Sequence, residues 1–201
     1  MVAKVLITGF EPFGGGTTNP SQDVVEHLQT ITPENWLFKV LPVSFEKAKA
    51  GIQQLMSAEQ PDIVLMLGLA GDASKYRLET QAVNLATARI PDNDGNQPID
   101  VPVIVADEMN QVLMGTWPTD KLFEQLAASG HDVSISDNAG RYVCNATYYA
   151  ALQQAVAIDN GAGEYRPRVG FLHIPPDRSL AETSDLVTEI VEHLAAEISE
   201  K

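Results

Sequence analysis

Cys144 is the single cysteine of the chain, and its position suits a nucleophile. It follows the strand-like segment 133–136 and the turn DNAGRY, and it lies in the opening turn of a helix predicted over residues 143–159. At a helix start, unpaired backbone amides and the helix dipole stabilise a thiolate, and the adjacent Arg141 can add positive charge. The same amides can bind an oxyanion. A lone cysteine is more often a small buried hydrophobic residue, so position alone leaves both interpretations open.

His173 is the histidine best placed to act as a base. It ends the strand-like segment RVGFLHI and is followed by two prolines that restrict the backbone. Working groups of α/β proteins gather at the carboxyl ends of strands, so we expect His173 to lie near Cys144. Without Cys144, a hydrogen-bonded histidine at a strand end would be the simpler interpretation. The remaining histidines have polar or acidic neighbours and are interpreted as solvated side chains: His27, His131 and His193.

Glu79, in the segment YRLETQAVN, is the candidate acid that would orient the imidazole. A thiol and an imidazole act as nucleophile and base when a third polar group fixes the ring. The surroundings of Glu79 are half apolar, and a carboxylate there needs a partner. His173 and Arg89 are candidate partners. An ordinary ion pair with Lys75 or Arg77 is the alternative, and spacing does not decide between them.

The elements that must position these residues alternate between apolar strands and amphipathic helices, which is the pattern of an α/β fold. We predict a three-layer α/β/α sandwich with a mostly parallel, twisted sheet and helices on both faces. Asn19 should cap the first helix, and Ser179 with Glu182 should form a capping box at the last. The strands are expected at residues 2–8, 37–43, 62–69, 77–86, 133–136 and 169–174, and the helices at 20–30, 45–59, 119–129, 143–159 and 179–200.

Two segments lack these periodic patterns. Residues 88–102 contain three prolines and an Asp-Gly turn signal, so they are predicted to form an ordered loop or a β-hairpin. Residues 160–166 are predicted to be a polar connection. Neither segment reads as a linker between domains, so we expect one domain over residues 1–201.

Charge and cysteine content limit the classes of function. The chain has 27 acidic and 13 basic residues and a formal net charge of -14, which disfavours nucleic acid and membrane partners. It has no apolar run long enough to span a membrane and no signal-peptide pattern, so a cytoplasmic location is expected. One cysteine excludes a disulfide within the chain and a multi-thiolate metal site. No metal or cofactor is expected.

Six ordered motifs resemble those of the pyroglutamyl peptidase I family, also called the pyrrolidone carboxyl peptidases. They span almost the whole chain: TGFEPFGGGTTNPS, LPVSF, LETQAVN, ARIPDNDGNQP, SDNAGRYVCNATYY and FLHIPP. The resemblance implies a cysteine-type omega-exopeptidase that removes an N-terminal pyroglutamyl residue from peptides through an acyl-enzyme. It also implies catalytic roles for Cys144, His173 and Glu79, and a role for Arg89 at the oxyanion site.

The implied substrate requires a largely apolar slot, because pyroglutamate is a flat lactam without an α-ammonium charge. The resemblance places Phe10 and Phe13 around its ring, and two aromatic side chains in a glycine-rich loop can hold a small planar group. Both phenylalanines could instead be core residues, and Asn19 has the competing role of helix cap. The residues that the resemblance places in this slot are Phe10, Phe13, Asn19, Ile90, Tyr142 and Val143.

Two motifs depart from the family pattern. Leu69 and Asp72 stand in GLAGDA where bacterial members often resemble GQAGGR, and Tyr142 replaces a phenylalanine that is common before the Val-Cys pair. We expect these changes to affect substrate affinity more than reaction type. The resemblance further suggests a homo-oligomer, a tetramer as described for bacterial relatives.

Two alternatives come from other functional classes. A phosphorylase-like enzyme on a similar sheet would need phosphate-holding basic groups, which are scarce in these loops. A non-catalytic lactam-binding module would have no need for an intact set of Cys144, His173 and Glu79.

Overall fold

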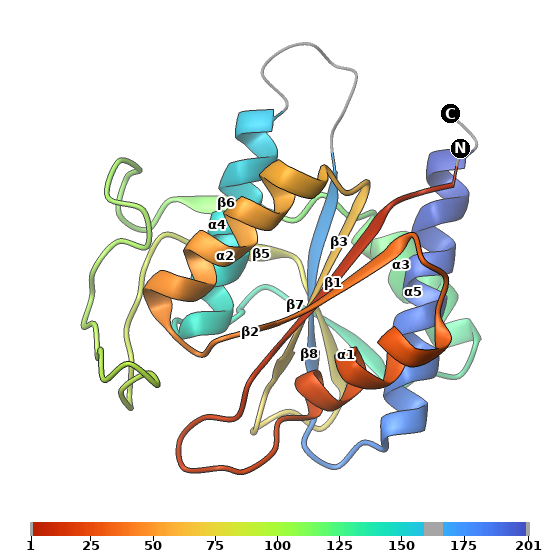
Figure 1. The fold of residues 1–201 in the computed structure, drawn as a ribbon, viewed down its shortest axis with the longest axis horizontal. Coiled ribbons are helices and arrows are strands. Elements are labelled where there is room, and N and C mark those ends of the chain that lie inside the picture. Colours follow the sequence, from red (N-terminus) through yellow and green to blue (C-terminus); the bar gives the residue numbers. More distant parts are fainter. Residues whose placement is uncertain (1, 159–166, 200–201) are drawn as a thin grey trace.

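A six-stranded sheet forms the centre of the computed structural model, which describes residues 2–158 and 167–199 (Figure 1). The spatial order is β2-β1-β3-β8-β4-β7. Strands β1, β2, β3 and β8 run parallel, whereas β4 pairs antiparallel with β8 and parallel with β7. The bounds are β1 (Val5–Phe10), β2 (Trp36–Leu41), β3 (Ile63–Leu69), β4 (Tyr76–Glu79), β7 (Val133–Ser136) and β8 (Arg168–Ile174).

Helices cover both faces of the sheet, which confirms the predicted three-layer α/β fold (Figure 1). One layer holds α2 (Phe45–Glu59) and α4 (Val143–Ile158). The other holds α1 (Pro20–Ile31), α3 (Thr119–Ala128) and α5 (Leu180–Ser199). Successive strand residues point to opposite faces, so Leu6 packs in the α2/α4 layer while Val5 and Ile7 pack in the other.

Polar side chains define where the helices begin, as the sequence predicts. The Asn19 side chain accepts a hydrogen bond from the Ser21 amide at 3.1 Å, and Pro20 occupies the first helical position of α1. The Ser179 hydroxyl accepts from the Glu182 amide at 3.2 Å before α5, which is one half of the predicted capping box, whereas the Glu182 carboxylate accepts from Arg178 Nη1 at 3.0 Å. Each such cap contributes about 1 kcal/mol to stability and fixes the direction in which the chain enters the helix.

The predicted extended segment 77–86 differs from the observed structure. It divides between β4 and a separate strand, β5 (Gln81–Val83), which pairs with β6 (Val112–Met114) in a second, two-stranded sheet. Strand β6 was not expected, because three residues are too few to establish an alternating pattern. Residues 88–102 form an ordered loop closed by one isolated bridge between Ala86 and Val101. The expected polar connection over residues 160–166 lies outside the described residues.

Gly170 lets the strand that carries His173 pack closely against an indole ring. A Cβ atom built at Gly170 would overlap the indole of Trp117. We expect Gly170→Ala to lower the free energy of unfolding by about 2 kcal/mol or more, measured by urea denaturation, because the ring or the strand must move. Gly71→Ala is the matched control: nothing lies within 4 Å of a Cβ there, so a change within about 0.5 kcal/mol is expected. Equal losses in both variants would contradict this packing.

Candidate active site

A buried carboxylate–imidazole pair lies on the α2/α4 side of the sheet. Glu79 Oε1 lies 2.7 Å from His173 Nδ1, and the two residues are 1% and 6% exposed. The sheet register explains the contact. Glu79 lies directly opposite Phe171 in the antiparallel β4–β8 ladder, and His173 is two residues further along the same face. Diagonal neighbours of this kind are within reach of long side chains.

The Cys144 thiol lies over the neighbouring strand β3, at the level of His173. Gly68 is directly opposite His173 in the β3–β8 ladder, and a Cβ built at Gly68 would lie only 2.9 Å from Cys144 Sγ. The same Cβ would lie 2.8 Å from the Phe171 ring. A glycine in a central strand often marks such a close approach. The glycine in the apolar run IVLMLGL was therefore a signal for this site that the sequence analysis did not use.

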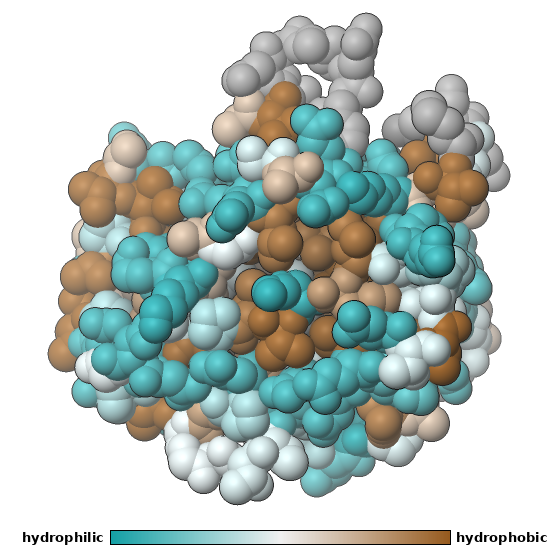
Figure 2. Space-filling model, in the orientation of Figure 1, coloured by the Kyte–Doolittle hydropathy of each residue, from teal (hydrophilic) through white to brown (hydrophobic). Residues whose placement is uncertain are grey.

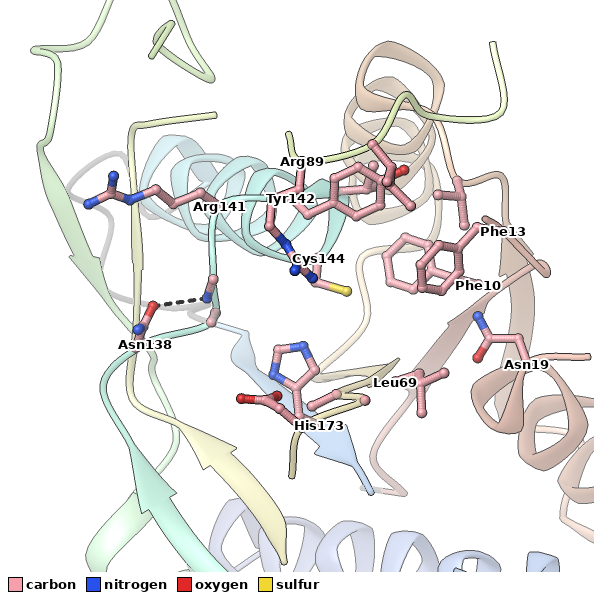
Figure 3. A pocket seen from close by; sticks show the side chains of 18 of the residues that line it. Phe10, Phe13, Asn19, Leu69, Arg89, Asn138, Arg141, Tyr142, Cys144 and His173 are labelled. Carbon is pink, nitrogen blue, oxygen red and sulfur yellow. Dashed lines mark hydrogen bonds between the residues drawn. The ribbon is translucent and has the colours of Figure 1, made fainter. Parts of the chain in front are cut away.

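Cys144 is the second residue of α4, close to the unpaired end of the helix. The Ala146 amide makes the first helical hydrogen bond, to the Tyr142 carbonyl at 3.1 Å, so the amides of Val143, Cys144 and Asn145 precede the intrahelical ladder. These donors can face an anion at the thiol. Arg141 does not reinforce them as expected, because its side chain points away from Cys144 (Figure 3).

The two partners of His173 determine its protonation. Burial by itself lowers the pKa of His173, but hydrogen bonding with the Cys144 sulfur and the Glu79 carboxylate, together with their electrostatic attraction for the charged imidazolium, outweighs this effect and raises the pKa to about 9. At neutral pH the imidazole is therefore protonated in this state. The charged imidazolium is the form of His173 that can donate a proton to a leaving group.

A cavity of about 660 Å³ opens beside these groups and contains both Cys144 and His173 in its wall. The sulfur projects between the imidazole of His173 and the rings of Phe10 and Phe13 (Figure 3). Tyr142 packs against Phe13 with ring centroids 5.9 Å apart, so this end of the cavity is aromatic. Every residue predicted for the substrate slot lines the cavity: Phe10, Phe13, Asn19, Ile90, Tyr142 and Val143.

Asn19 lines the cavity but uses its amide group for the fold. Its Oδ1 accepts from the amide and the hydroxyl of Ser21, and its Nδ2 donates to the Glu11 carbonyl at 3.0 Å. The residue is 1% exposed. The capping role is therefore observed, whereas a substrate contact for Asn19 stays a prediction.

The loop at residues 88–102 is fixed from both sides, which the sequence analysis did not predict. The buried Asp92 carboxylate accepts from the Phe45 amide at the start of α2 at 2.9 Å. Asn93 Nδ2 donates to Glu11 Oε1 at 2.7 Å, which joins the loop to the segment between Phe10 and Phe13. The acidic and amide side chains of the run PDNDGN were the available signal.

The hydroxyl that distinguishes Tyr142 from the family's phenylalanine has a partner in the same loop. It donates to the Pro91 carbonyl at 3.0 Å, and burial raises the pKa of Tyr142, so the phenol stays protonated as a donor. The start of α4 is thus tied to the loop that carries Arg89 and Ile90. The other two departures, Leu69 and Asp72, also line the cavity.

The alternative ion pairs proposed for Glu79 are made by other carboxylates. Lys75 pairs with Asp132 at 3.1 Å, and Arg77 pairs with the exposed Asp72 at 3.4 Å. The Arg77 guanidinium, by its hydrogen bond and its charge, lowers the pKa of Asp72. Arg89 lines the cavity and extends toward Cys144 in the view of Figure 3.

Two histidines that were expected to be solvated lie beside a carboxylate. His131 Nε2 lies 2.8 Å from Glu189 Oε2, and its side chain is 15% exposed, so His131 is paired and not solvated. His193 lies 3.3 Å from the same carboxylate. Within residues 2–158 and 167–199, no three His, Cys, Asp or Glu side chains gather so as to hold a metal ion. In the same part of the chain, no helix has both the length and the apolar character needed to cross a bilayer.

Comparison with known proteins relates the chain to one family. The family model described as pyroglutamyl peptidase matches residues 3–197. A pyrrolidone-carboxylate peptidase of Bacillus cereus is 35% identical over 173 residues, which is 85% of this chain and 77% of that protein. A mutant pyrrolidone carboxyl peptidase from Pyrococcus furiosus has a similar structure, with a TM-score of 0.85 and 31% identity, covering 96% of this chain and 99% of that one. Pyroglutamyl peptidase I from Bacillus amyloliquefaciens gives a TM-score of 0.84 and 31% identity, covering 96% and 97%.

The raised pKa of His173 predicts how stability depends on pH. The pKa of His173 in the folded protein, near 9, exceeds the ordinary value of 6.5. The contribution of His173 to the free energy of unfolding is therefore fully present below pH 6.5 and is lost as pH rises through 9. Glu79→Gln removes the charge on one partner, so it should lower the pKa of His173 and flatten this decline. Urea denaturation from pH 6 to 10 and NMR titration of the imidazole measure both effects. Glu26→Gln, at an exposed position of α1, should leave them unchanged. An unaltered His173 titration in Glu79→Gln would contradict the assignment.

Proposed function

Because this chain belongs to the pyroglutamyl peptidase family, we propose that it is a cysteine-type omega-exopeptidase that hydrolyses the bond after an N-terminal pyroglutamyl residue. One observation carries the proposal: the Cys144 thiol and His173, whose imidazole is paired with the buried Glu79 carboxylate, lie in the wall of one cavity with an aromatic end. A nucleophile, a base and an orienting acid are the groups that acyl transfer through a thiol requires.

In the proposed first step, the Cys144 thiolate attacks the carbonyl carbon that links pyroglutamate to the next residue. The carbonyl oxygen becomes an oxyanion, which the amides at the start of α4 and the Arg89 guanidinium stabilise. The C–N bond then breaks, and protonated His173 gives its proton to the departing amine. The product is a pyroglutamyl thioester on Cys144 and a peptide shortened by one residue.

The second step returns the enzyme to its starting state. Neutral His173 accepts a proton from water as the water oxygen attacks the thioester carbon. The C–S bond breaks, free pyroglutamate leaves, and the sulfur is again a thiolate beside the imidazolium. Glu79 keeps the imidazole oriented through both steps and stabilises its charged form.

The aromatic end of the cavity accounts for the proposed choice of the first residue. The rings of Phe10, Phe13 and Tyr142 offer apolar surface to a flat lactam, and Ile90 and Val143 add to it. The Asn19 side chain caps α1 and donates a hydrogen bond to the Glu11 carbonyl. The proposed role of Asn19 is therefore to shape the slot. The nitrogen of pyroglutamate is already part of the lactam ring, so no residue precedes it in a peptide, and an enzyme that accepts this ring acts as an exopeptidase.

The two alternatives receive less support. The related proteins are peptidases, which disfavours a phosphorylase-like enzyme. A module that only binds lactams would not need a buried carboxylate held against an imidazole beside a thiol, because burying such a charge lowers stability. We propose that residues 1–201 form one catalytic domain. A reducing cytoplasm would suit it, since the proposed reaction requires the free thiol of Cys144.

A second copy of this chain is the proposed partner of an exposed apolar segment. Six large apolar residues between positions 99 and 114 are exposed, and Figure 2 shows apolar surface on the flank where Figure 1 places this segment. Such patches on soluble proteins commonly mark interfaces. The six are Ile99, Val101, Val105, Met109, Val112 and Met114.

The nucleophile is tested by release of a chromogenic amine from its pyroglutamyl derivative. Cys144→Ser should lower kcat/KM by at least about a thousandfold, because an alkoxide is not available at neutral pH in place of the thiolate. Alkylation of the wild-type protein should give a parallel loss, since Cys144 is the single cysteine. Circular dichroism checks that the variant is folded. Equal release by the wild type and the serine variant would rule out Cys144 as the nucleophile.

The interface is tested by light scattering coupled to size-exclusion chromatography. The wild type should have the mass of an oligomer, and the double substitution Val105→Asp and Met114→Asp should lower the mass toward that of one chain. The control is Ile31→Asp, because Ile31 is 64% exposed at the end of α1 and lies outside the segment. A monomeric wild type would refute the proposed self-association, and an equal effect of the control would refute this surface.

A further inference from the structure

The cavity has a second, polar end beyond the thiol. Arg141 and Asn138 lie on the side of Cys144 opposite to Phe10 and Phe13 (Figure 3). Both residues belong to the turn between β7 and α4, and both line the cavity. Attack at Cys144 divides a substrate into the acyl part and the leaving amine. If the acyl part occupies the aromatic end, the residue that follows pyroglutamate must extend toward Asn138 and Arg141.

Positive charge predominates in the wall of this cavity, although the chain as a whole has a net charge of -14. Three arginines line it, whereas Asp72 is its one acidic lining residue among those the structure describes. Asp72 pairs with Arg77 at 3.4 Å, which leaves two arginines to consider: Arg89 and Arg141.

Neither of these two guanidinium groups has a carboxylate partner among the described residues. The chain has 27 acidic residues against 13 basic ones, so carboxylate partners for basic side chains are plentiful in the protein. Among the described lysines and arginines, seven do form ion pairs with carboxylates: Lys4, Lys47, Lys49, Lys75, Arg77, Lys121 and Arg178. Two unpaired arginines in the wall of one cavity therefore stand out as a place for an anion from outside the chain.

The backbones of both arginines are held in place while their charged ends are exposed. The Thr87 amide donates to the Arg141 carbonyl at 2.9 Å, and Gln97 Nε2 donates to the Arg89 carbonyl at 3.1 Å. The Asp100 carboxylate near this turn accepts from the Thr87 hydroxyl at 2.7 Å. Fixed backbones and exposed guanidinium groups suit recognition of a carboxylate on an incoming peptide.

We propose, on the basis of the function proposed above, that this end of the cavity selects peptides whose second residue is acidic, with Arg141 as the main contact. Arg89 adds to the positive potential while it faces the oxyanion. The side chains of Arg89 and Arg141 are partly open to solvent. The expected preference for an acidic second residue is therefore moderate and weakens as ionic strength rises.

The test compares three amidated dipeptides in which pyroglutamate is followed by glutamate, glutamine or lysine. Amidation removes the terminal carboxylate, so the side chain is the one variable charge. At low ionic strength, kcat/KM for the glutamate peptide should exceed that for the isosteric glutamine peptide about fivefold, and the lysine peptide should be the poorest. The preference should shrink toward unity in about 1 M salt.

Two variants separate a local contact from the net charge of the protein. Arg141→Gln should reduce the glutamate-to-glutamine ratio to about twofold or less. Lys39→Gln is the matched control, because Lys39 is an exposed cation on β2 outside the cavity and the substitution changes the net charge equally. It should leave the ratio as in the wild type.

Each remaining outcome overturns the inference in a recognisable way. A wild-type ratio near one, with all three peptides cleaved, would reject the acidic preference and leave the proposed function intact. Equal changes in the Arg141 and Lys39 variants would show that the preference comes from net charge. Failure to cleave any of the three peptides would reject the proposed function and this inference together.

Discussion

The hydrogen bond between Glu79 and His173 is the interaction on which the site depends. A carboxylate with 1% exposure lowers stability unless it has a partner, and the imidazole is that partner. The bond requires β4 to run antiparallel to β8, because this register puts Glu79 and His173 on the same face, two residues apart along the ladder. A parallel β4 would pair different residues. The reversal at β4, which lies between β8 and the edge strand β7 of a mostly parallel sheet, is therefore part of the catalytic arrangement that we propose.

The position of the Cys144 sulfur depends on a different constraint, which is the space left by the neighbouring strand. Gly68 leaves room for Cys144 Sγ beside the Phe171 ring, and the start of α4 brings unpaired amides to the same point. Around this centre, the loop at residues 88–102 is bound to α4 by Tyr142 and to α2 by Asp92. The cavity walls thus come from segments far apart in the sequence that hydrogen bonds hold together. Their fixed positions allow a small, rigid ligand to be recognised without large rearrangement.

Much of the fold follows from local patterns in the sequence. The apolar runs of β1, β3 and β8, the helical period of α2 and the cap at Asn19 each require only a few neighbouring residues, so their positions agree with the predictions to within a few residues. Strand β6 and the break between β4 and β5 were missed because they depend on partners distant in the chain. The direction of β4 was not predicted either, since apolar pattern does not encode strand direction.

The site was predictable to a similar extent. Cys144, His173 and Glu79 stood out by residue type and by position near strand and helix ends, and the resemblance to a family assigned roles to them. We expected them to converge because working groups gather at the carboxyl ends of strands. This reason was incomplete, because β4 and β7, which lead to Glu79 and Cys144, run opposite to β8. Arg141 lies close to the thiol in sequence but points away from it, which depends on the shape of the turn. The side-chain hydrogen bonds of Asp92, Asn93 and Tyr142 join segments that are distant in the sequence, so local patterns do not predict them.

In the proposed reaction, the sulfur of Cys144 bonds to an acyl carbon while the lactam occupies the aromatic end of the cavity. A crystal structure of the wild-type protein with the aldehyde analogue of pyroglutamate tests this directly. We expect a covalent bond between the aldehyde carbon and Cys144 Sγ, with the new oxygen facing the start of α4 and the ring beside Phe10 and Phe13. An aldehyde bound to another residue, or a ring placed beside Asn138 and Arg141, would contradict it.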